Sequence, residues 1–212
     1  MRLIAFALAL ALPAFPARSQ ESTIPAPESA EGVAVRGSLG VIKPKSSQAK
    51  GEGVALAVEL ERRLQSGLRY GIDLTLFGVD FRTPEGLGCG PFCTVDSTMS
   101  LQVVGLSGTV GYGRQFGIAD LYIGAGAGVY FSTMSASENL LGIPGEHDEK
   151  DTGLGGDLRA GISLAVSGST SLGIQVRRLA LSGNFGPLGS MPTGGSLVLL
   201  TLAACLPHCA RQ

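Results

Sequence analysis

The sequence predicts an all-β fold, a closed antiparallel up-and-down barrel of about eight strands that spans a membrane. Segments of roughly ten residues alternate between apolar residues and polar or small ones, as strands with two different faces do. The connections between these segments alternate between short and long, which is typical of membrane barrels with short turns at one end. In lipid every backbone polar group must be paired within the protein, so strands cross only as a closed barrel.

The clearest alternation lies within Met99–Ser132. From Leu121 to Phe131 every second residue is apolar, and the residues between them are glycine or tyrosine, preceded in the same phase by Asp120. An entirely apolar face suits contact with lipid, and the opposite face suits the wall of a narrow lumen. The segment Val104–Tyr112 alternates in the same way, and Arg114–Gly117 separates the two runs as the turn of a hairpin.

The remaining strands are placed by the same period. One strand covers Val33–Val41, and a last one covers Gly194–Ala204, which is too apolar throughout for its faces to be assigned. Two further hairpins are expected, one over Val54–Leu76 with a turn at Gln65–Gly67 and a bulge near Phe77–Gly78, and one over Asp157–Arg177 with a turn at Ser167–Thr170.

Four longer connections are expected to face outwards. Variable function sits on loops that a rigid scaffold holds, so these loops are the predicted binding surface. They cover Lys43–Gly51, Thr83–Ser97, Thr133–Thr152 and Gly183–Thr193.

The N-terminal residues indicate export. Met1–Ser19 carries Arg2, an apolar core over Leu3–Leu12 and a small-residue end, the pattern of a cleaved signal peptide. This core is shorter than the ~20 residues of a spanning helix. Gln20–Gly32 is polar and without period, which predicts a flexible segment. The barrel is therefore expected over residues 33–204, with a tail at 205–212.

Charged residues collect on the lumen face. On the assigned phase, five arginines face five carboxylates there, and charges confined in a narrow interior must be paired to offset their desolvation. This predicts a salt-bridged core that fills the lumen rather than a pore. Arg178 falls on the lipid face, where a charged side chain is unfavourable. Extension of the side chain towards the interface would reduce that free-energy cost. The predicted network contains Arg36, Glu59, Glu61, Arg63, Arg69, Asp73, Asp120, Asp157, Arg159 and Arg177.

The chain resembles the small eight-stranded outer-membrane barrels of Gram-negative bacteria, the OmpA-like and OmpX-like group. The predicted signal, the alternating segments and the glycine and aromatic alternation of Leu121–Tyr130 (LYIGAGAGVY) carry the resemblance. It implies a monomer in outer-membrane lipid with a structural or adhesin-like role, whose loops meet an external protein or surface ligand. The alternative is a soluble periplasmic lipocalin-like barrel, which binds an apolar ligand and turns its apolar faces inwards.

Candidate chemistry is sparse. The 16 Lys and Arg nearly balance the 17 Asp and Glu, which gives no basis for a nucleic-acid partner. His147 and His208 lie outside the predicted strands, which argues against a catalytic triad and against an enzyme. No cofactor or metal is expected, because neither acidic Glu146–Asp151 nor the group Cys205, His208 and Cys209 has a complete ligand pattern.

The four cysteines are predicted to form no bridge across the barrel. Cys89 and Cys93 lie in an expected external loop, and Cys205 and Cys209 follow the last strand at the other end. A disulfide needs Cα atoms within about 7 Å, whereas the rims of a membrane barrel are at least ~25 Å apart. The local bridges Cys89–Cys93 and Cys205–Cys209 stay open. Non-reducing peptide mapping checks this, and a peptide that joins the two pairs within one monomer would contradict the spanning barrel.

Overall fold

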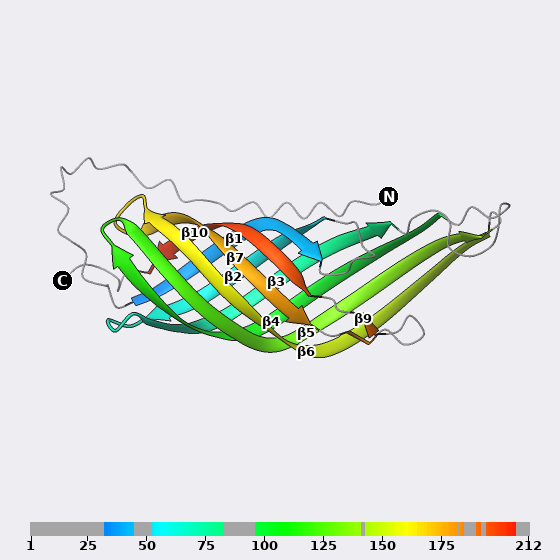
Figure 1. Cartoon of the computed structure of the whole chain (residues 1–212), viewed down its shortest axis with the longest axis horizontal. Helices are drawn as coiled ribbons and strands as arrows, with labels where there is room; N and C mark the ends of the chain where they lie inside the picture. Colours follow the sequence, from blue (N-terminus) through cyan, green and yellow to red (C-terminus); the bar gives the residue numbers. More distant parts are fainter. Residues whose placement is uncertain are drawn as a thin grey trace.

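The computed structural model describes residues 32–44, 52–82, 96–140, 143–181, 183–184, 190–191 and 194–206. In this part of the chain eight strands close into one antiparallel barrel, in the order β1-β10-β7-β6-β5-β4-β3-β2 (Figure 1). This confirms the predicted fold class. The barrel strands are β1 (Gly32–Pro44), β2 (Gly53–Arg63), β3 (Leu68–Arg82), β4 (Asp96–Phe116), β5 (Ala119–Leu140), β6 (Ile143–Ala165), β7 (Thr170–Leu181) and β10 (Gly195–Cys205).

The register fixes the tilt of the strands. A path that starts at Val33 on β1 and always steps to the opposite residue returns to β1 at Lys43, ten residues further along. This shift over eight strands implies a tilt of about 40° and an interior that side chains alone can fill. The steps between are Arg62, Tyr70, Val110, Ala125, Leu158, Arg178 and Ser196.

Short turns lie at one end of the barrel. They follow β2, β4 and β6, and two of them contain glycines in the left-handed region, Gly67 with φ 86° and Gly117 with φ 60°. The start of β1 and the end of β10 lie at the same end, because Ala34 is opposite Cys205. Outer-membrane barrels keep their short turns and termini on the periplasmic side, so the long connections face outwards.

The predicted loop Thr133–Thr152 is wrong for most of its length. β5 continues to Leu140, β6 begins at Ile143, and the two strands pair without a break through this stretch. Backbone hydrogen bonds hold the hairpin together there. This segment lies outside the lipid, so its two faces need not differ in hydrophobicity. The alternating pattern that marked the other strands is therefore missing from its sequence.

Two of the other three predicted loops are shorter than expected. β1 runs to Pro44 and β4 begins at Asp96, so both strands take residues from the predicted loops. The last loop contains two short paired strands, β8 (Gly183–Asn184) and β9 (Ser190–Met191). Most other residues of these loops, together with residues 1–31 and 207–212, lie outside the described part of the chain, and so do the predicted signal peptide and flexible segment.

The predicted bulge at Phe77–Gly78 is also wrong. β3 pairs with β4 without interruption from Leu68 to Arg82. Phe77 and Val79 both point into the barrel, where they are buried. At this height of the barrel the inward-facing residues are apolar, as the outward-facing ones are. The alternation in the sequence therefore no longer distinguishes the two faces. The same change explains β10, in which Leu197 and Leu199 face inwards and Leu200 faces outwards.

The outer face of the barrel is apolar. Its side chains include Ile72 at 56% exposed and Ile123 at 65% exposed, and similar residues cover every barrel strand. This exposed surface excludes the soluble alternative, which required apolar faces turned inwards. No helix in the described residues is long and apolar enough to cross a membrane. The band includes Leu39, Leu56, Leu74, Leu106, Val110, Val129, Leu158, Ile162, Ile174, Val176 and Leu200.

The lipid-facing band predicts a depth-dependent cost for a charge. Ile72→Arg, at the middle of the lipid-facing run Leu68–Leu76 on β3, is expected to lower the free energy of unfolding by about 2–4 kcal/mol in lipid vesicles. Val166→Arg, in the exposed turn after β6, is the control and is expected to cost at most about 1 kcal/mol. Urea titration of the refolded barrel measures both. Equal costs at the two positions would contradict this placement of the membrane.

Candidate functional site

Glu59 on β2 lies at the centre of the lumen and joins three strands. Arg36 on β1 donates from Nη1 to Glu59 Oε2 at 2.9 Å, and Arg159 on β6 donates from Nη1 to Glu59 Oε1, also at 2.9 Å. All three residues are at least 95% buried. A carboxylate shared by two arginines across the lumen ties opposite walls of the barrel together.

Asp73 on β3 holds a second arginine. Arg177 on β7 donates from Nη1 to Asp73 Oδ1 at 2.9 Å, and its Nη2 lies 2.8 Å from Asp73 Oδ2. The first contact is a hydrogen bond between charged groups, and the second adds charge attraction at short distance. The Arg177 Nε donates to Gln175 Oε1 at 2.6 Å, so this guanidinium is fixed on both edges.

A third set of pairs lies towards the periplasmic mouth. Arg69 donates to Asp120, and Arg63 donates from Nε to Glu61 Oε1 at 2.7 Å. The Tyr122 ring lies beneath two of the network's guanidiniums, with the Cζ atom of Arg36 at 4.4 Å and that of Arg69 at 5.3 Å from its centroid. These cation–π contacts add to the ion pairs.

All ten charged residues predicted for the network lie on the inner face, and the structure brings them into contact. Nine are buried, and the tenth, Arg63, has a side chain that is 22% exposed at the mouth. Asp157 completes the set by accepting two hydrogen bonds from Arg159, from Nε and Nη2, each at 2.8 Å. The sequence interpretation did not single out Tyr122, Thr75 or Gln175, although each occurs in the same inward phase.

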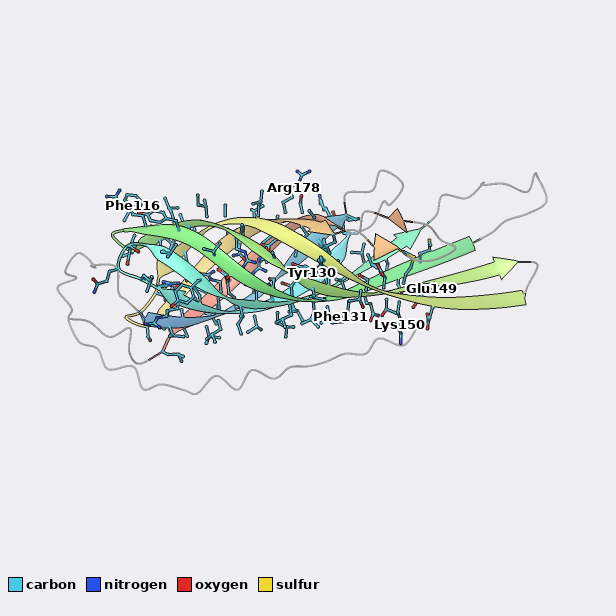
Figure 2. The ribbon with its side chains drawn as sticks, turned by 90° about the horizontal axis from the view of Figure 1, so that it is seen from below. Phe116, Tyr130, Phe131, Glu149, Lys150 and Arg178 are labelled. Carbon is cyan, nitrogen blue, oxygen red and sulfur yellow. The ribbon has the colours of Figure 1, made fainter. Side chains whose placement is uncertain are left out.

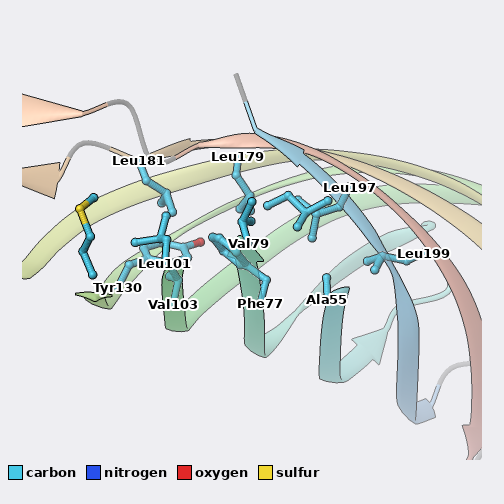
Figure 3. Packing of buried hydrophobic residues seen from close by; sticks show 12 residues of the cluster. Ala55, Phe77, Val79, Leu101, Val103, Tyr130, Leu179, Leu181, Leu197 and Leu199 are labelled. Atoms are coloured by element: carbon cyan, nitrogen blue, oxygen red, sulfur yellow. The ribbon is translucent and has the colours of Figure 1, made fainter. Parts of the chain in front are cut away.

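An apolar layer lies above the charges, on the external side, and Figure 3 shows how its side chains pack together. Sequence reasoning missed this layer, because it treated the whole inner face as polar. The layer separates the charged network from the outside, and its desolvated environment strengthens the ion pairs below it. It consists of Ile42, Ala55, Phe77, Val79, Leu101, Val103, Tyr130, Met134, Leu179, Leu181, Leu197 and Leu199.

The charged level of the lumen is nearly filled. A cavity of about 10 Å³ lies among Arg36, Glu59 and Tyr122, which is about the space of one water molecule. A wider recess of about 120 Å³ opens at the periplasmic mouth between Arg63, Asp120 and the turn after β6.

Three strands project beyond the barrel wall. β4, β5 and β6 are 21, 22 and 23 residues long, whereas the other barrel strands have 11 to 15. Figure 1 shows them continuing as one sheet past the ends of their neighbours. Asp148 and Lys150 on β6 are exposed on this sheet (Figure 2 shows Lys150).

The remaining sequence candidates are only partly described. No cluster of His, Cys, Asp and Glu in the described residues has the arrangement of a metal site. Cys205 ends β10, whereas Cys89, Cys93, Cys209 and His208 lie outside the described residues, so the disulfide pairing stays a prediction.

Solved structures share this architecture. Neisserial surface protein A, NspA, matches with a TM-score of 0.53 and 19% identity, over 82% of this chain and 97% of that chain. OprG from Pseudomonas aeruginosa matches with a TM-score of 0.53 and 13% identity, over 84% of this chain and 97% of that one. At these identities the likeness shows the fold alone. No curated protein matches the chain in sequence.

A membrane-spanning barrel with an apolar belt, a salt-bridged lumen and strands that project outwards is an outer-membrane protein of the small-barrel class. The model of the outer membrane protein beta-barrel domain matches residues 5–193. The chain belongs to this family, and its location is the cell outer membrane.

The network predicts a strongly non-additive pair of substitutions. Removing one partner of a buried ion pair costs about 3–5 kcal/mol, whereas replacing both with apolar residues is often nearly neutral. Arg177→Met and Asp73→Leu are each expected to lower the free energy of unfolding by that amount, and the double variant by much less than the sum.

Urea unfolding in lipid vesicles measures this cycle. Glu52→Gln is the control, because Glu52 pairs with Lys43 at 3.3 Å through side chains that are about 70% exposed. Such surface pairs contribute at most about 1 kcal/mol. Additive costs for the Arg177 and Asp73 variants would show that the two residues are not energetically coupled.

Proposed function

We propose that this chain is a non-enzymatic surface protein, and that its projecting sheet of β4, β5 and β6 binds an external macromolecule. The observation that carries the proposal is the length of these three strands, which continue together beyond the barrel wall. Neither lipid contact nor barrel closure requires this extra length. A rigid sheet held above the membrane is suited to contact with another surface.

The edge of β6 supports this role. β7 pairs with β6 only from Gly155 to Ala165, and in the described part of the chain Ile143–Lys150 pairs with β5 alone. An unpaired strand edge offers backbone groups to which an extended segment of a partner can add as a further strand.

The charges of this edge favour a selective partner. Charged residues on an edge strand prevent indiscriminate pairing. Within this edge the sequence of Glu146–Lys150 holds three carboxylates and one lysine, so a partner with basic residues complements it. The filled lumen supports an interaction role over transport, because it leaves no wide passage through the charged level.

A variant without the projecting tip tests the proposal. Ser135 and Asp148 are opposite each other, so an Asn-Gly turn in place of residues 136–147 keeps the register of β5 and β6. Cells that display the natural chain are expected to adhere to epithelial layers above the level of empty cells. Cells with the shortened hairpin are expected to fall to that level.

Arg114→Gln, at the periplasmic end, is the control and is expected to leave adhesion unchanged. Heat-dependent mobility on gels verifies that each variant is folded in the membrane. Adhesion that persists without the tip would contradict the proposal. Sustained single-channel steps from the purified protein in planar bilayers would instead favour transport.

A further inference from the structure

Three polar side chains interrupt the apolar outer face on adjacent strands. Arg178 on β7 is opposite Ser196 on β10, and Ser196 is opposite Lys43 on β1. All three face outwards and are exposed. Figure 2 shows Arg178 directed away from the barrel wall. The two cationic residues are two strand spacings apart, which is about 10 Å.

This row lies at the external end of the lipid-facing band. Below Arg178 on the same face of β7 are Ile174 and Val176, and below Lys43 on β1 are Leu39 and Val41, all four apolar and exposed. Above the row the strands end, β7 at Leu181 and β1 at Pro44. The side chains of the row are therefore within reach of the headgroups of the outer leaflet.

Arg178 has no carboxylate partner among the described residues. Its backbone neighbours on either side are Leu158 and Ser196, neither of which carries a charge. An arginine on the lipid face costs about 2–4 kcal/mol at the midplane and little near the interface. A long side chain close to the interface reduces that cost by extending towards it. An anion at headgroup level is the counter-charge that this arrangement lacks.

We propose that Arg178 and Lys43, on either side of Ser196, bind a phosphate group of a lipid headgroup in the outer leaflet. A guanidinium offers paired donors that fit phosphate, an ammonium supplies a further charge, and the Ser196 hydroxyl is a donor between them. The Lys43 side chain is 70% exposed and pairs with Glu52 at 3.3 Å, a surface contact weak enough for a phosphate to compete with it. The site would hold individual lipid molecules against the wall formed by β7, β10 and β1.

Arg114 provides a matched control at the opposite end. It also faces outwards and is exposed, but it lies next to the periplasmic turn, with its Cζ atom 5.4 Å from the centroid of the Phe116 ring. It therefore tests whether any outward arginine has the same effect.

The experiment measures binding of purified lipid A to the refolded barrel in detergent, with doubly phosphorylated and dephosphorylated lipid A as probes. The natural chain is expected to prefer the phosphorylated form. Arg178→Gln is expected to weaken that binding about tenfold, the loss of one charge-assisted contact, and to leave the dephosphorylated form unaffected. The affinity of Arg178→Lys for the phosphorylated form is expected to lie between those of the natural chain and of Arg178→Gln.

Further outcomes decide the site and the source of the phosphate. Arg114→Gln is expected to bind like the natural chain, and Lys43→Gln to weaken binding of the phosphorylated form. Inorganic phosphate is expected not to compete at millimolar concentration, because the acyl chains contribute to lipid binding. Equal affinity for both forms of lipid A, or equal loss in the Arg178 and Arg114 variants, would overturn the proposal. Competition by inorganic phosphate would overturn the assignment to a lipid headgroup.

Discussion

The pairing of backbone hydrogen bonds in lipid is the constraint on which the structure depends. No water reaches the backbone there, so an open sheet edge would leave N–H and C=O groups unsatisfied. Closure of β10 onto β1 removes both edges. The residue shift needed for closure then sets the tilt and the radius, and the radius of an eight-stranded barrel determines that side chains fill the lumen.

A filled lumen makes the charges inside it interdependent. Each buried charge is costly without a partner, and each carboxylate here has an arginine within ion-pair distance. The pairs connect strands that are not neighbours, as between Arg177 on β7 and Asp73 on β3. The network therefore acts across the barrel, where backbone hydrogen bonds cannot. The apolar layer lies on the external side, so the charges are enclosed between this layer and the periplasmic recess.

The sequence predicted the faces well wherever the two faces differ in chemistry. The buried charges Glu59 and Arg159 each stand between two apolar residues of their strand, so their inward direction followed from the period. The two faces could not be told apart where inward and outward residues have the same chemistry. Leu199 and Leu200 are chemically alike, yet one lies in the lumen and one meets lipid. The specific ion pairs could not be predicted from the sequence either. They depend on the shift of register around the barrel, which the sequence of one strand does not determine.

The strands that project beyond the wall obey a different rule. Outside the membrane, water satisfies backbone groups, so an unpaired edge is tolerated and an apolar outer face is no longer needed. The sequence changes accordingly: Phe131 on β5 is still apolar and exposed, whereas Asp148 and Lys150 on the extended part of β6 are charged. Charge on this edge limits non-specific pairing. The part of the sheet that is released from closure is thus free of the two constraints that fix the barrel below it, the contact with lipid and the buried ion pairs.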